Sequence, residues 1–218
     1  MRVRGVAVAA TFSGLIALVV LYIVFFLTSA PAAISAVTTN GTAQLTLQTV
    51  PSFGHHPFPD WVSYLAKDSS GHWQHTTIFK VPAHTLVKVT IYQYDGASGL
   101  RNNFLAKVQG TKGGVEVLNG KAVSTINPDD AAHTFSVPDL DINVPMPGVD
   151  ANAKNQCAVA PCTLAEAHNT ITFSFVSPGP GTYRWQCFVP CALAFLYGNG
   201  GPAGVGARAA EDSLMTPR

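Results

Sequence analysis

Short stretches in which apolar and polar residues alternate recur along the chain from residue 76 onward. Thr76–Val81 and Leu86–Tyr94 show this alternation with many β-branched residues, and Pro82–Thr85 supplies a turn between them. Three further runs of this kind lie at 133–137, 170–176 and 181–187. Short strands separated by turns, with no amphipathic helix of useful length, predict an all-β antiparallel sandwich or barrel.

The segments between these strands are polar or rich in Pro and Gly. Asp95–Gly120 reads as a long excursion in which Val115–Leu118 forms a short hairpin strand closed by the turn dipeptide Asn119-Gly120. Pro-rich loops are expected from residue 138 to Gly148.

The N-terminus has a different pattern. A basic start, Met1–Arg4, precedes an uncharged apolar run from Gly5 to about Leu27, and about 20 such residues suffice to cross a bilayer. The two arginines should stay on the cytoplasmic side, so the sequence predicts a single-pass cell-membrane protein whose C-terminal domain is extracytoplasmic. A cleaved signal peptide is the alternative, because Ala30–Ala33 offers small residues to a peptidase.

Four segments are therefore expected along the chain. Residues 1–28 form a transmembrane anchor or uncleaved signal, 29–70 a linker or strap, 71–203 the β domain and 204–218 an irregular tail. The strap carries His55-His56, which is more often solvated than a metal ligand in such a loop.

Composition and motifs exclude several classes of function. The chain has 218 residues and a formal net charge of +1, and charged residues make up 11% of it. No basic stripe suggests a nucleic-acid surface. The Gly-x-Ser-x-Gly elbow, the P-loop and the His-Glu-x-x-His motif are all missing from the sequence, so no catalytic constellation competes with a metal site.

All four cysteines lie between positions 157 and 191. Cys157 and Cys162 are expected to form a local disulfide that pins a loop. Cys187 and Cys191 follow a strand, and His133 opens another strand about fifty residues upstream; a soft metal needs thiolate and imidazole ligands of this kind. A disulfide between Cys187 and Cys191 is the competing interpretation.

Two blocks carry a resemblance to a known family. The first is His133-Thr134-Phe135-Ser136-Val137-Pro138, and the second runs from Pro180 through Tyr183-Arg184-Trp185-Gln186-Cys187 to Cys191. Together with the strand-turn-strand before them, they resemble cupredoxins, specifically the copper domain of cytochrome c oxidase subunit II and related bacterial membrane-anchored proteins. The resemblance covers roughly residues 73–203.

This resemblance implies a Greek-key β-sandwich that binds copper through His133, Cys187 and Cys191, with the backbone carbonyl of Val189 as a further ligand. It implies electron transfer outside the cytoplasmic membrane, to a redox partner protein or within a terminal oxidase complex, so the chain is expected to be an electron carrier or oxidase subunit more than a stand-alone enzyme.

The chain departs from the family pattern after Cys191. Phe195 and Gly198 stand where the family has a histidine and a methionine, Ala203 stands where related domains have a methionine, and no closing strand is evident after residue 203. His84 and His168 are candidates for the missing imidazole. Two further functions stay open: an assembly or interaction subunit with a degenerate metal site, and a copper-delivery protein.

Overall fold

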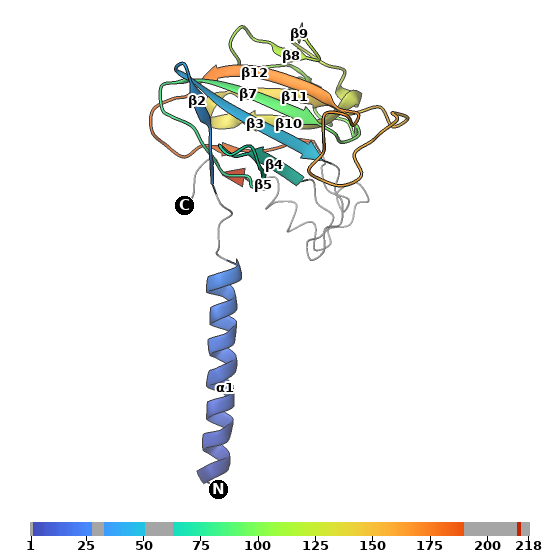
Figure 1. Cartoon of the computed structure of the whole chain (residues 1–218). Helices are drawn as coiled ribbons and strands as arrows, with labels where there is room; N and C mark the ends of the chain where they lie inside the picture. Colours follow the sequence, from blue (N-terminus) through green and yellow to red (C-terminus); the bar gives the residue numbers. More distant parts are fainter. Residues whose placement is uncertain (1, 28–32, 51–62, 190–212, 215–218) are drawn as a thin grey trace. The chain divides into compact units, whose positions relative to one another are not determined.

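The computed structural model describes residues 2–27, 33–50, 63–189 and 213–214, and in the N-terminal helix it describes the side chains of residues 10–25 only. The chain divides into two units, Met1–Pro31 and Ala32–Arg218. The first unit is helical, and the second contains the strands (Figure 1).

The N-terminal unit is helix α1 (Arg2–Tyr22), which continues as the π-helical turn η1 (Ile23–Leu27). Its large apolar side chains are exposed from Phe12, at 65%, to Phe25, at 67%. Within the described residues, no helix combines the length and the apolar character needed to cross a membrane.

The larger sheet of the second unit has the strand order β5-β4-β3-β7-β12-β8-β9, and β2 pairs with the first residues of β3. Strands β3 and β7 run parallel, and their neighbours in this sheet are antiparallel. The strands are β2 (Val37–Thr39), β3 (Thr42–Val50), β4 (Ser63–Lys67), β5 (Trp73–His75), β7 (Leu86–Gln93), β8 (Glu116–Leu118), β9 (Lys121–Val123) and β12 (Asn169–Val176).

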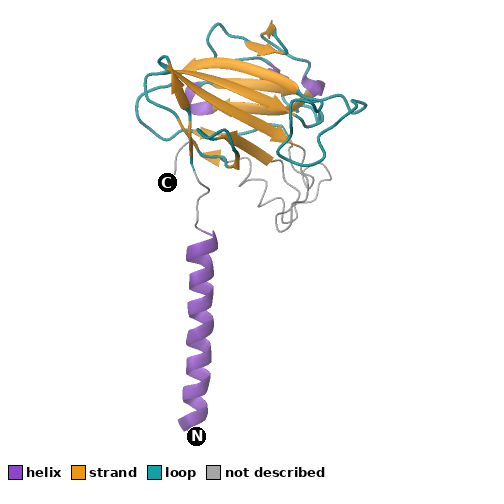
Figure 2. Ribbon diagram, viewed as in Figure 1, coloured by secondary structure: helices purple, strands orange, loops and turns teal. Residues whose placement is uncertain are grey.

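A second layer contains shorter pairings. Strand β10 (Ala131–Val137) pairs antiparallel with β11 (Ile142–Pro147), and a bridge between Ser136 and Gln186 places the end of β13 (Arg184–Trp185) beside β10. The remaining pairs are β1 (Ile34–Ser35) with β6 (Phe79–Lys80) and β13 with β14 (Ser213–Leu214). Apart from α1 and η1, the described helical segments are the 3₁₀ turns η2 (Asn103–Ala106), η3 (Pro128–Asp130) and η4 (Pro138–Leu140) (Figure 2).

Aromatic side chains from both layers form the core. Phe135 of β10 stacks on Trp185 of β13, with ring centroids 5.3 Å apart, and contacts Phe173 of β12 at 5.4 Å. Phe79 of β6 stacks on the same indole at 5.5 Å. These rings are nearly or fully buried, so the predicted β-sandwich is confirmed as two sheets packed face to face around an aromatic core.

The prediction of a linker at 29–70 is wrong for much of that segment. Strand β3 lies inside the larger sheet, paired with β4 on one side and β7 on the other. Its polar residues alternate with buried Ala43, Leu45 and Leu47. The period of two was therefore present in a segment that was interpreted as a linker because proline and glycine are dense further along it. His55 and His56 lie outside the described residues.

The sheet is mixed, and the prediction of a purely antiparallel sandwich is therefore also wrong. Parallel pairing of β3 with β7 is possible because β4, β5 and β6 intervene and give the chain room to cross over. Strand β11 occupies the expected Pro-rich loop. Pro145 lies at the edge of a two-stranded sheet, where a missing N–H is tolerated.

Of two local predictions, one is confirmed and the other is wrong in part. The hairpin β8–β9 is confirmed: Asn119 and Gly120 both have positive φ, at 48° and 83°, as its two-residue turn requires. The tail 204–218 was expected to lack a strand, but Ser213–Leu214 pairs with β13; the rest of the tail lies outside the described residues.

Candidate metal site

The candidate site lies where three strand ends meet. Asp95 follows the end of β7, His133 lies near the start of β10, and Cys187 follows the end of β13. The bridge between Ser136 and Gln186 is antiparallel, with N–H···O distances of 3.1 and 2.8 Å. This register carries Cys187 back along β10 towards His133.

The structure brings the two sequence-predicted donors together. Nδ1 of His133 lies 3.8 Å from Sγ of Cys187, although 54 residues separate them in the chain. The imidazole is fully buried and Cys187 is 8% exposed. A strand start and a strand end thus converge, as the sequence predicted. Cys191, the third predicted ligand, lies outside the described residues.

A carboxylate orients the other side of the imidazole. Nε2 of His133 lies 3.1 Å from Oδ2 of Asp95, and the second carboxylate oxygen accepts the backbone N–H of Gly96 at 2.8 Å. A histidine that binds a metal commonly donates its other ring N–H to such a carboxylate. Since Asp95 engages Nε2, the lone pair available to a metal is on Nδ1, the atom that faces the sulfur.

Hydrogen bonds from a buried side-chain amide hold the backbone of Asp95 in place. The side chain of Gln93 donates to the carbonyl of Asp95 at 3.1 Å and accepts its backbone N–H at 3.2 Å. Thr49 of β3 donates its hydroxyl to the same Gln93 side chain. Gln93 and Thr49 are fully buried, so the orientation of the carboxylate is tied to the pairing of β3 with β7.

Burial and hydrogen bonding act in opposite directions on the pKa of His133. Desolvation lowers it, but the hydrogen bond to Asp95 and the contact with Cys187 outweigh burial and raise the pKa of His133 to about 9. The metal-free imidazole is therefore protonated at neutral pH, and a metal ion entering the site has to displace that proton.

Two backbone groups among the described residues also contact the sulfur of Cys187. The backbone N–H of Thr134 points at Sγ at 3.4 Å, and the carbonyl oxygen of Val189 lies 3.7 Å from it. The hydroxyl of Thr134 accepts the N–H of Phe188 at 2.8 Å, which fixes the turn that follows the cysteine. The Val189 carbonyl that the family resemblance implicated thus lies beside the sulfur.

The donor set fits a soft metal ion. An ion bonded to one imidazole nitrogen and one thiolate, with a tetrahedral or trigonal angle between them, holds the two atoms about 3.6–3.8 Å apart. The observed 3.8 Å between Nδ1 of His133 and Sγ of Cys187 agrees with that separation. The same separation is that of a hydrogen bond between the thiol and the imidazole, so the pair is compatible both with a metal-free hydrogen bond and with one soft ion that touches both atoms.

Three residues around the site were not singled out from the sequence as site residues. The ring of Tyr64 packs edge-on to His133 at 6.0 Å and to Trp185 at 4.7 Å, and Met146 is the cross-strand partner of His133. Asp95 had a usable signal, because it directly follows the predicted strand 86–94. Tyr64 had none, because its segment was interpreted as a strap.

The two histidines considered as substitutes lie elsewhere. His84 is in the turn before β7, where its N–H bonds to Pro178, and the eight residues of β7 separate it from the Asp95 end. His168 packs against Tyr92 and Tyr94, with its Nδ1 2.7 Å from the carbonyl of Glu166. The predicted disulfide between Cys157 and Cys162 is confirmed, and it belongs to a separate cluster.

The fold and this geometry define a two-layer β-sandwich with a buried imidazole–thiol pair at one pole. No family model matches the sequence, and no curated protein matches it. Crystal structures of two rusticyanin variants resemble the chain loosely. A histidine-to-methionine variant gives a TM-score of 0.30 at 17% identity, covering 75% of this chain and 78% of its own. A methionine-to-leucine variant gives 0.28 at 18%, covering 75% and 77%. Scores this low carry no weight for function.

Proposed function

We propose that this chain is a cupredoxin-type copper protein that transfers electrons, with Nδ1 of His133 and the thiolates of Cys187 and Cys191 as ligands. The observation that carries the proposal is the 3.8 Å approach of the imidazole nitrogen to the Cys187 sulfur. Bound copper would supply a one-electron couple. The chain holds two of these ligands, His133 and Cys187, close together before a metal arrives.

The residues of the site perform three tasks. Asp95 holds the His133 ring in one orientation, and the N–H of Thr134 stabilises negative charge on the sulfur. An apolar cluster of Leu100, Ala106 and Ala131 packs beside Cys187 and limits the access of water. A rigid, dry ligand set changes little between two oxidation states of a metal, which favours electron transfer over substrate chemistry.

We also propose that residues 1–28 attach the protein to the cell membrane, with the β domain on the extracytoplasmic side and a redox protein or terminal oxidase as its partner. The support is the uncharged apolar run from Gly5 to Leu27 and the exposure of its described side chains. Phe188, 40% exposed beside Cys187, offers an apolar contact point for such a partner.

Copper loading of the purified full chain tests the metal site. We expect one intense set of thiolate-to-copper absorption bands, abolished in Cys187→Ser and in His133→Ala. His84→Ala, at the other end of β7, is the matched control and should keep the spectrum. Absence of copper binding, or an unchanged spectrum in Cys187→Ser, would refute the proposed ligands.

Two alternative functions follow from the residues after Cys191. Phe195, Gly198 and Ala203 cannot supply the nitrogen and sulfur ligands expected at those positions. An assembly subunit without a metal would give no copper bands, and a copper-delivery protein would bind the ion weakly and release it to a chelator. The strength and reversibility of loading therefore separate the three functions.

A further inference from the structure

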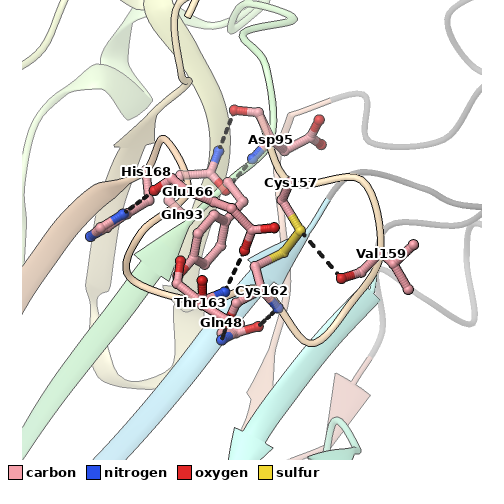
Figure 3. The surroundings of a disulfide bond; sticks show 10 residues. Gln48, Gln93, Asp95, Cys157, Val159, Cys162, Thr163, Glu166 and His168 are labelled. Carbon is pink, nitrogen blue, oxygen red and sulfur yellow. Dashed lines mark hydrogen bonds between the residues drawn. A yellow bond between two sulfur atoms is a disulfide. The ribbon is translucent and has the colours of Figure 1, made fainter. Parts of the chain in front are cut away.

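A second group of metal-binding atoms lies on the loop that follows Gly148, in the cluster of the disulfide. Sγ of Cys157, Sγ of Cys162 and a carboxylate oxygen of Glu166 all lie within 4.8 Å of one another. The carbonyl oxygen of Val159 lies 3.7 Å from the sulfur of Cys157 and faces it (Figure 3). Two sulfurs and a carboxylate oxygen thus lie close together, with a backbone carbonyl beside one of the sulfurs.

The half of this group around Cys162 is held without the help of the disulfide. Gln48 of β3 bonds to the backbone of Cys162 in both directions, accepting its N–H at 3.0 Å and donating to its carbonyl at 2.6 Å. The hydroxyl of Tyr94 donates to the carbonyl of Thr163 at 3.0 Å. Glu166 accepts the backbone N–H of Thr163 (Figure 3). None of these bonds involves the sulfurs, so we expect them to hold Cys162 and Glu166 in place when the sulfur–sulfur bond is broken.

The second cysteine needs to move little. The α carbons of Cys157 and Cys162 are 5.7 Å apart, and both side chains are nearly buried, at 4% and 3% exposure. Two thiolates on one zinc ion, each at about 2.3 Å in tetrahedral geometry, are about 3.8 Å apart. The spacing of the two α carbons is compatible with that sulfur–sulfur separation after a rotation of the Cys157 side chain. Val50, Leu65 and Tyr94 pack in the same cluster as the two cysteines.

We propose that the reduced form of this loop is a second metal site, which binds a zinc ion through Cys157, Cys162, Glu166 and the carbonyl of Val159. A dithiol or phosphine reductant adds two electrons and two protons to the disulfide and yields two thiols. The zinc ion then displaces both protons and bonds to the thiolates. The disulfide thus closes the site, and reduction opens it, independently of the His133 site.

The carboxylate gives the site its preference for zinc. Zinc takes mixed sulfur, nitrogen and oxygen ligands in a tetrahedron, whereas monovalent copper prefers sulfur alone. Two thiolates and one carboxylate carry three negative charges around a doubly charged ion. The remaining ligand, the Val159 carbonyl, is neutral.

Zinc titration of the full chain tests the site in a Cys187→Ser/Cys191→Ser background, which removes the other two thiols. After phosphine reduction we expect one equivalent of zinc to bind in competition with a chromophoric chelator, and the oxidised form to bind none. Cobalt substitution should give thiolate-to-metal bands that disappear in Cys157→Ser. Glu166→Gln should weaken zinc by about tenfold or more.

Three results would overturn the proposal. The first is a reduced protein that binds no zinc. The second is zinc binding that survives Cys157→Ser, which would place the ion elsewhere. The third is loss of the β-type circular dichroism spectrum on reduction, which would show that the loop is not held by Gln48 and Tyr94. Because Cys187 is absent from this background, failure here leaves the copper proposal standing.

Discussion

Glu116, in strand β8 between β12 and β9, is a buried carboxyl group whose removal should stabilise the protein. Its side chain is fully buried, and neither carboxylate oxygen has a hydrogen-bond partner among the described residues. Desolvation raises the pKa of Glu116 from 4.5 to about 8. The next residue, Val117, is 38% exposed, so the strand alternation places the acid inward and the valine outward.

The sign of the effect follows from linkage. The folded-state pKa of Glu116 is higher than that of the unfolded chain, so the unfolded state loses its proton first as the pH rises. The free energy of unfolding should therefore fall between about pH 4.5 and pH 8 and level off above. At about 1.4 kcal/mol per pKa unit, the loss amounts to roughly 3 kcal/mol at pH 7 and approaches 5 kcal/mol above pH 8.

Glu116→Gln removes the titrating group while keeping its shape. We expect the variant to match the wild type near pH 4.5 and to exceed its unfolding free energy by up to about 3 kcal/mol at pH 7. Urea denaturation at pH 4.5, 6, 7 and 8 measures the difference. Asp139→Asn, at an exposed acid, is the control and should change little. A Glu116→Gln gain that does not grow with pH would refute the argument.

Three further predictions concern the metal site and the backbone around it. Asp95→Asn keeps a hydrogen-bond acceptor but removes the charge that holds His133. Copper affinity should therefore fall about 10- to 100-fold, with an unchanged circular dichroism spectrum. An unchanged affinity would contradict this role. Copper affinity should rise at least tenfold per pH unit between pH 6 and 8, because binding displaces the proton of His133, whose pKa is about 9, together with any proton on the thiol ligands. Competition titrations at three pH values measure this slope, and a flat profile would contradict it. Gly148→Ala should destabilise the protein, because the added Cβ would overlap the backbone of Ala97; Gly14→Ala, where nothing lies within 4 Å, is the control in thermal unfolding.

The local elements of the fold and the pairing of one sulfur with one imidazole could be predicted from the sequence. Alternation predicted β7 and β12 because each has one buried face, and the turn dipeptide Asn119-Gly120 predicted the β8–β9 hairpin. The convergence of His133 and Cys187 was predictable because both lie at strand ends.

What the sequence did not reveal depends on pairings between distant segments. Nothing local to Thr42–Val50 says that it pairs parallel to β7, since parallel register is set by the whole sheet. The role of Asp95 arises only when the end of β7 in the larger sheet meets the start of β10 in the other layer. From its side-chain type alone, Asp95 cannot be distinguished from the other polar residues of the loops.

The same arrangement links metal binding to the packing of the two layers. Asp95 belongs to a segment fixed by Gln93 and Thr49 of the larger sheet, whereas His133 and Cys187 belong to the β10–β13 pairing of the other layer. A metal bound by His133 and Cys187, as proposed, would therefore close a network that spans both layers, with Asp95 as the connection. Since the unfolded chain cannot assemble these atoms, such an ion would bind the folded state selectively, and its binding free energy would add to the stability of the sandwich.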